Sequence, residues 1–93
     1  MAKILAVDDS ASMRQMVSFT LKGAGHQVDE ASNGQEAMGK ARSGKYDLVI
    51  TDANMPVMDG ISLIRNLRAE AAYRFTPMLM LTTESAAEKK SEG

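Results

Sequence analysis

The sequence predicts an α/β fold, a three-layer sandwich in which helices cover both faces of a parallel sheet. The first observation is a set of three short apolar runs without polar alternation, at residues 4–7, 48–51 and 78–81. Such runs are typical of parallel strands buried on both faces. The second observation is that the apolar spacing between these runs changes to the period of a helix. Alternating strands and helices indicate right-handed β-α-β crossovers, so residues 1–93 are expected to form one domain.

The strand at residues 4–7 leads into the first predicted helix. Ser10 or Ser12 can cap its start, and the run Gly23-Ala24-Gly25 can end it. The stripe expected to be buried, at helical spacing, consists of Met13, Met16, Val17, Thr20 and Leu21. Methionine fills irregular core gaps well, and the ones predicted to do so are Met13, Met16, Met78 and Met80.

The second strand is the weakest of the predicted strands. It spans residues 27–30, where only Val28 is clearly apolar, so it suits an edge of the sheet. Asn33 and Glu36, spaced like a capping box, then predict the start of the second helix. This helix is expected to end at Gly44.

The third helix is predicted to begin at Asp59 and Gly60, a typical turn and helix-start pair. Its apolar stripe consists of Ile61, Leu63, Ile64, Leu67 and Ala71. The last apolar run, residues 78–81, follows as the fourth strand. Residues 85–93 could hold two turns of a further helix.

Composition excludes several kinds of protein. The chain has no cysteine and a single histidine, His26, which excludes disulfides, thiol catalysis and a histidine-based metal cluster. A net charge of −1 from 11 basic and 12 acidic residues leaves no broad basic field for nucleic acid and no polybasic membrane patch. The N-terminus lacks a signal-type segment, and no apolar run approaches the roughly 18 residues of a membrane span. The expected location is cytoplasmic, with neither a nucleic acid nor a membrane as partner.

Polar residues stand where the strongest strands end. Asp8 and Asp9 follow the first strand, Asp52 ends the third, and Thr82 follows the fourth. Ligands of open α/β sheets bind at this edge, where parallel strands bring their carboxyl ends together. Carboxylates so close repel one another and raise one another's pKa. A hard divalent cation such as Mg²⁺ relieves this repulsion. A carboxylate can also attack phosphorus, so the edge predicts metal-assisted phosphoryl transfer to an aspartate.

Three motifs run in order along the whole chain. They are Val7-Asp8-Asp9-Ser10 followed by Met13-Arg14, then Asp52-Ala53-Asn54-Met55-Pro56 with Met58-Asp59-Gly60, and then Leu81-Thr82-Thr83-Glu84. In residue type, spacing and order they resemble the receiver domain of two-component response regulators, especially the single-domain chemotaxis type. The resemblance implies a flavodoxin-like sandwich with the parallel sheet order 2-1-3-4.

The resemblance also implies a role for each matching residue. Asp52 would be the phosphoacceptor, phosphorylated by a histidine kinase, and Thr82 the switch hydroxyl that turns toward the phosphoryl group. Asp8 and Asp9 would bind Mg²⁺ together with Asp52 and the backbone carbonyl of Asn54. A downstream protein target would recognise the phosphorylated form. The chain would then be a signalling module and no enzyme, beyond Mg²⁺-dependent self-phosphorylation and dephosphorylation.

The family's fifth strand, the lysine at its end and the last helix have no counterpart before Gly93. The expectation is a C-terminally truncated receiver, lacking that strand and helix. The fourth strand would then present an exposed edge beside an uncovered face of the sheet. Apolar edges and faces of this kind associate, so a homo-oligomer through either surface is expected.

Three other functions remain open from the sequence. The chain could be a truncated or engineered fragment that self-associates as a structural building block without competent phosphorylation. It could be a metal-dependent phosphatase or mutase, although these enzymes carry Asp-x-Asp after the first strand and this chain has Asp8-Asp9. It could be a flavodoxin-type cofactor binder, although two aspartates would repel a phosphate at that loop.

Overall fold

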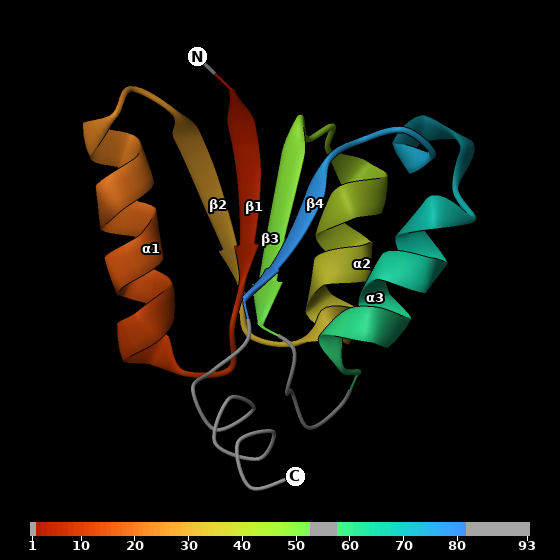
Figure 1. The fold of residues 1–93 in the computed structure, drawn as a ribbon, viewed down its shortest axis with the longest axis horizontal. Helices are drawn as coiled ribbons and strands as arrows, with labels where there is room; N and C mark the ends of the chain where they lie inside the picture. The colour runs from red at the N-terminus through yellow and green to blue at the C-terminus, as the bar shows by residue number, and fades with distance from the viewer. Residues whose placement is uncertain (1, 53–57, 82–93) are drawn as a thin grey trace, which may run out of the picture.

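The computed structural model describes residues 2–52 and 58–81. The elements are β1 (Lys3–Val7), α1 (Ala11–Gly23), β2 (Gln27–Ala31), α2 (Gly34–Ser43), β3 (Leu48–Asp52), α3 (Gly60–Arg68), a 3-10 turn (Ala71–Tyr73) and β4 (Met78–Leu81). The strands form one sheet in the order β2-β1-β3-β4, and every pair is parallel. Figure 1 shows α1 on one face of the sheet and α2 and α3 on the other. The predicted α/β sandwich, its sheet order and the edge position of β2 are confirmed.

The register of the sheet aligns the carboxyl ends of its central strands. Val7 of β1 lies opposite Thr51 of β3, and the next residue of β3, Asp52, lies opposite Leu81 of β4. The chain leaves β1 and β3 at the same edge, at the bottom of the view in Figure 1. Asp8 and Asp52 therefore reach this edge from neighbouring strands, as parallel topology requires.

The core lies on both faces of the sheet because successive side chains of a strand point to opposite faces. On the face of α2 and α3, Leu5 and Val49 pack with Leu63 and Leu67, and all four are fully buried. On the face of α1 the cluster is smaller and consists of Ile4, Ala6, Val28 and Ile50, with Val17 and Leu21 packed against it. The short apolar runs are thus buried on both sides of β1 and β3.

The predicted buried stripe of the first helix is wrong in part. Met13, Met16 and Thr20 are exposed, whereas Val17 and Leu21 contact the core. The helix packs over β2 and β1, so the part of its stripe that faces β4 has no element against it among the described residues. The prediction of Met13, Met16 and Met80 as core fillers is therefore wrong, since all three are exposed, while Met78 does pack against the larger cluster.

The third helix ends earlier than its apolar stripe predicts. It stops at Arg68, and Ala71 lies in the 3-10 turn. The guanidinium of Arg68 donates to the carbonyls of Tyr73, Arg74 and Thr76 at 3.3, 3.1 and 2.7 Å, which gathers the following segment around the helix end. Ile61 is also exposed, so only part of the stripe is buried.

The predicted caps are present. The Asn33 side chain accepts a hydrogen bond from the amide of Glu36 at 2.8 Å, and the Glu36 carboxylate accepts from the amide of Ser32 at 2.8 Å. The Ser32 hydroxyl also donates to this carboxylate, at 2.7 Å, and the two bonds from Ser32 hold the pKa of Glu36 below its ordinary value. Ser10 caps α1, and Asp59 caps α3 through the amide of Ser62 at 2.8 Å. Among the described residues, no helix is both long and apolar enough to span a bilayer.

Candidate metal and phosphoacceptor site

The backbone at the end of β1 fixes the first aspartate of the site. The amide of Asp8 donates to the carbonyl of Ala31 at 3.1 Å, which extends the pairing with β2 beyond Val7. The Asp8 carboxylate accepts a hydrogen bond from the amide of Ser10 at 2.9 Å. Asp8 is therefore held by both its backbone and its side chain at the point where β1 turns into α1. Its exposed fraction is 8%.

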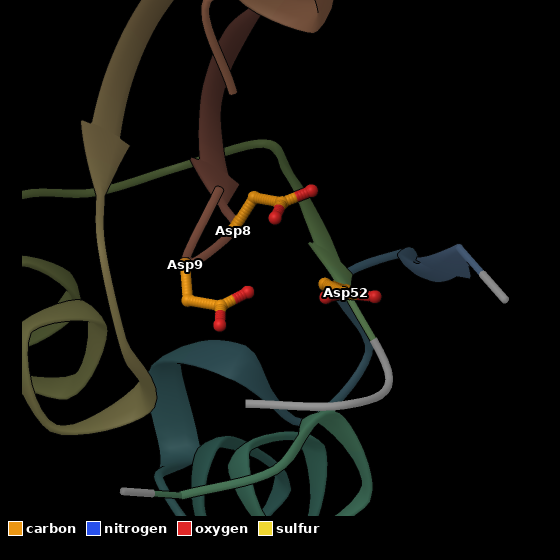
Figure 2. Close-up of side chains that lie close together, drawn as sticks. All are labelled: Asp8, Asp9 and Asp52. Carbon is orange, nitrogen blue, oxygen red and sulfur yellow. The ribbon is translucent and has the colours of Figure 1, made fainter. Parts of the chain in front are cut away.

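Three carboxylates gather at this edge. Asp8, Asp9 and Asp52 each offer one oxygen, and these oxygens lie within 4.8 Å of one another. Asp8 and Asp52 are buried, while Asp9 is exposed. Figure 2 shows the three side chains at the ends of β1 and β3, with the carboxylate of Asp9 directed toward Asp52. The predicted convergence of these three residues is thus present.

The donor set fits a hard divalent cation. Negative charges at this spacing repel one another, and the repulsion grows as water is excluded around the buried members. Mg²⁺ prefers oxygen ligands, and it is usually bound by one or two carboxylates with water and phosphate oxygens completing its shell. The described residues of the cluster offer carboxylate oxygens and no sulfur or imidazole ligand, which favours Mg²⁺ or a similar ion over Zn²⁺.

Two of the predicted site residues cannot be placed. The backbone carbonyl of Asn54 and the hydroxyl of Thr82 lie outside the described residues. Asp59 and Gly60, predicted as a turn and helix start, do form the beginning of α3.

One neighbour of the site, Arg14, stands out in the sequence only as part of the first motif. Arg14, in the first turns of α1, donates from Nη1 to the backbone carbonyl of Asp8 at 2.7 Å. Its Nε donates to the Glu30 carboxylate on β2 at 3.1 Å, which is also an ion pair. Lys40 of α2 donates to the carbonyl of Glu30. No spacing rule predicts these contacts, because they join separate elements that only the tertiary fold brings together.

Comparison with known proteins places the chain in a family. The family model for the response regulator receiver domain matches residues 4–93. The chain is 41% identical over 88 residues to the chemotaxis protein CheY-3 of Vibrio cholerae, covering 94% of this chain and 68% of that protein. It is also 38% identical over 91 residues to the gliding motility regulatory protein of Myxococcus xanthus, but it spans only 12% of that protein's length.

Solved structures agree with the sequence relatives. The structure of the chemotaxis response regulator CheY4 of Vibrio cholerae superposes with a TM-score of 0.88 at 55% identity, covering 100% of this chain and 78% of that chain. The response regulator TrrA of Thermotoga maritima, solved in complex with Mg²⁺-BeF, superposes with a TM-score of 0.73 at 28% identity, covering 99% of this chain and 97% of that chain. The chain belongs to the response regulator receiver domain family of two-component signalling, with a CheY-like, flavodoxin-like fold.

Proposed function

We propose that this domain accepts a phosphoryl group on Asp52 from a histidine kinase, with Mg²⁺ bound at the acidic edge. The observation that carries the proposal is the convergence of Asp8, Asp9 and Asp52 within 4.8 Å in a chain of the receiver family. A bound Mg²⁺ would neutralise charge on the phosphoryl oxygens and on the carboxylates. The solved relative TrrA, in complex with Mg²⁺-BeF, supports testing for the same ligand here.

In the proposed reaction, a carboxylate oxygen of Asp52 attacks the phosphorus of the phosphorylated kinase histidine. The new bond joins that oxygen to phosphorus, and the bond from phosphorus to the imidazole nitrogen breaks. Asp8 and Asp9 would hold the cation, so the residues of this chain supply position and charge rather than a general base. The backbone carbonyl of Asn54 is proposed as a further ligand.

The proposed output is a change at the surface. A phosphoryl group adds negative charge and strong acceptor oxygens next to β4, and the hydroxyl of Thr82 is proposed to turn toward them. A downstream protein target would bind the altered surface. Because the phosphodonor kinase uses ATP, we place the domain in the cytoplasm, and we treat residues 1–93 as one receiver unit. The family match over residues 4–93 and the complete acidic cluster do not favour the building block without phosphorylation.

Beryllofluoride, which mimics a phosphoryl group on a carboxylate, tests the site. The amide spectrum of the wild-type chain is followed by NMR as beryllofluoride is added with and without Mg²⁺. We expect the amides around Asp52 to shift only when both are present, and Asp52→Asn to remove the shift. A folded wild-type chain with no shift would refute the site. Asp47→Asn, at an exposed carboxylate that accepts from the Lys3 amide at 2.9 Å, is the matched control.

A second proposal concerns self-association. An apolar groove of about 220 Å³ runs between α1 and the edge of the sheet, lined by Met16, Val17, Thr20, Leu21, Ile50, Leu79 and Leu81. Met16 and Leu79 in its lining are 55% and 53% exposed, and within residues 2–52 and 58–81 β4 pairs with β3 alone. We propose that a second copy of the chain covers this surface. Sedimentation equilibrium at micromolar concentration should give a dimer that Leu79→Glu dissociates, and a monomeric wild-type chain would contradict it.

A further inference from the structure

The loop that carries Asp8 and Asp9 is tied to two other elements by a single side chain. The guanidinium of Arg14, on α1, donates through Nη1 to the carbonyl of Asp8 at 2.7 Å and through Nε to the carboxylate of Glu30 at 3.1 Å. The side chain of Arg14 is 18% exposed and that of Glu30 is 33% exposed, so this ion pair is shielded more than an ordinary surface pair. Arg14 thereby connects α1, β2 and the end of β1.

The bonded carbonyl is the one that links the two aspartates. It belongs to the peptide group between Asp8 and Asp9, and a peptide group is planar. Fixing this oxygen therefore also fixes the amide of Asp9 and the direction in which the chain enters the Asp9 residue. On the other side of Asp8, the amide is held by Ala31 at 3.1 Å. The backbone that presents both carboxylates is thus held before and after Asp8.

We propose that Arg14 is a positioning residue for the acidic site: through its two-point bond to Asp8 and Glu30 it sets the geometry in which Asp8 and Asp9 bind a divalent cation. The proposal rests on the proposed function of the site. Groups that orient the ligands of a metal site, without touching the metal, contribute strongly to metal affinity. A planar guanidinium suits this role, since its N–H groups form a rigid fork that the point-like ammonium of lysine cannot copy.

A positioning role and a purely electrostatic role of Arg14 predict opposite changes in Mg²⁺ affinity for the same substitution. Arg14 is a cation beside an acidic site, and it lines a small cavity together with Asp8. If Arg14 acted only through its charge, Arg14→Gln would remove a repulsive cation and Mg²⁺ would bind more tightly. If Arg14 positions the loop, the same substitution frees the peptide between the aspartates and Mg²⁺ binds more weakly.

The test is a Mg²⁺ titration of the full chain, with amide shifts of Asp8, Asp9 and Asp52 read by NMR. We expect Arg14→Gln to raise the Kd for Mg²⁺ by about tenfold, the lower end of the range for groups that orient metal ligands. Arg14→Lys and Glu30→Asp keep every charge but break the two-point geometry, so both should also raise the Kd. Arg42→Gln is the matched control, because that arginine pairs with Glu70 on the surface with 61% of its side chain exposed.

The titration distinguishes a failure of the positioning role of Arg14 from a failure of the proposed function of the acidic site. An unchanged or lower Kd in Arg14→Gln, or wild-type affinity in both charge-preserving variants, would overturn the positioning role. If Arg14→Gln does not give the dispersed spectrum of a folded chain, the two charge-preserving variants decide the result alone. A wild-type chain whose Asp8, Asp9 and Asp52 amides do not respond to Mg²⁺ would instead refute the proposed function of the site.

Discussion

The carboxylates of Asp8 and Asp52 lie within 4.8 Å of each other although Asp8 follows β1 and Asp52 ends a different strand, β3. The parallel register makes this possible, since Val7 lies opposite Thr51 and the two strands end at the same edge of the sheet. Each residue is only 8% exposed, so two like charges are held together where water screens them poorly. Like charges so close repel each other and a bound cation would relieve the repulsion, which is the physical basis for the predictions on the site.

Mg²⁺ is expected to stabilise the folded chain through this cluster. A ligand that binds only the folded state raises the melting temperature by mass action. Asp9→Asn removes one of the three carboxylates and should remove most of the rise in Tm that Mg²⁺ gives the wild-type chain, as measured by circular dichroism. Asp47→Asn, which keeps an oxygen to accept the Lys3 amide, should respond to Mg²⁺ like the wild-type chain. An equal rise in Tm for Asp9→Asn would exclude Asp9 as a ligand.

Two glycines of α2 are expected to respond to alanine in opposite directions. A Cβ on Gly34 would lie 2.6 Å from the Cβ and 2.8 Å from the carbonyl oxygen of Met58, so Gly34→Ala should cost about 1–3 kcal/mol in the free energy of unfolding. A Cβ on Gly39 meets nothing within 4 Å, and Gly39→Ala should stabilise the helix by about 0.5–1 kcal/mol. Urea unfolding of both variants measures the difference. Equal changes in the free energy of unfolding would mean that Met58 can move away from the new Cβ without loss of stability.

The N-cap of α3 is expected to make stability depend on pH. The hydrogen bond from the Ser62 amide lowers the pKa of Asp59 below its ordinary value of 3.8. A carboxyl with a lowered folded-state pKa stabilises the fold fully above its unfolded-state pKa, and this contribution is lost as the pH falls through the folded-state pKa. Asp59→Asn keeps a capping oxygen that does not titrate. Relative to this variant, the wild-type chain should lose stability on acidification below the ordinary value. If the difference in the free energy of unfolding between the two chains does not change with pH, the charge of Asp59 has no role in the cap.

The two faces of α3 are expected to differ sharply in their contribution to stability. Leu67 is fully buried against the sheet, whereas Ile61 on the same helix is 53% exposed. Leu67→Ala removes buried surface and leaves a cavity, so it should cost about 2–5 kcal/mol. Ile61→Ala should change the free energy of unfolding by about 0.5 kcal/mol or less, as expected for an exposed position. Comparable losses in chemical denaturation would show that Ile61 is covered in solution, for example by a second copy of the chain.

The sequence predicts the sheet and the acidic edge well because both depend on local patterns. Runs such as Leu5 with Ala6 and Val49 with Ile50 are apolar on both faces, and the aspartates that follow them lie at strand ends whatever the packing of the helices. The exposure of Met13 on α1 depends instead on which neighbours cover the helix. That information is not contained in the helical period, which is the same for a stripe that is covered and one that is not.

The contact of Arg14 is a further example of what local patterns cannot predict. Its partners are six and sixteen residues away, directly after β1 and on β2, and only the assembled fold brings the three elements together. The early end of α3 is a more local case, because the Arg68 side chain donates to carbonyls five and eight residues further along the chain. The backbone bonds of helices and strands follow the sequence period, whereas the bonds of Arg14 to Asp8 and Glu30 depend on the tertiary arrangement.

The phosphoacceptor role of Asp52 is tested most directly by the intact mass of the chain after treatment with acetyl phosphate, a small acyl phosphate donor, in the presence of Mg²⁺. The wild-type chain and Asp59→Asn should each gain the mass of one phosphoryl group, and chelation of Mg²⁺ should prevent the gain. Asp52→Asn should gain none. A phosphoryl group on Asp52→Asn, or none on the folded wild-type chain with Mg²⁺ present, would contradict phosphorylation at Asp52.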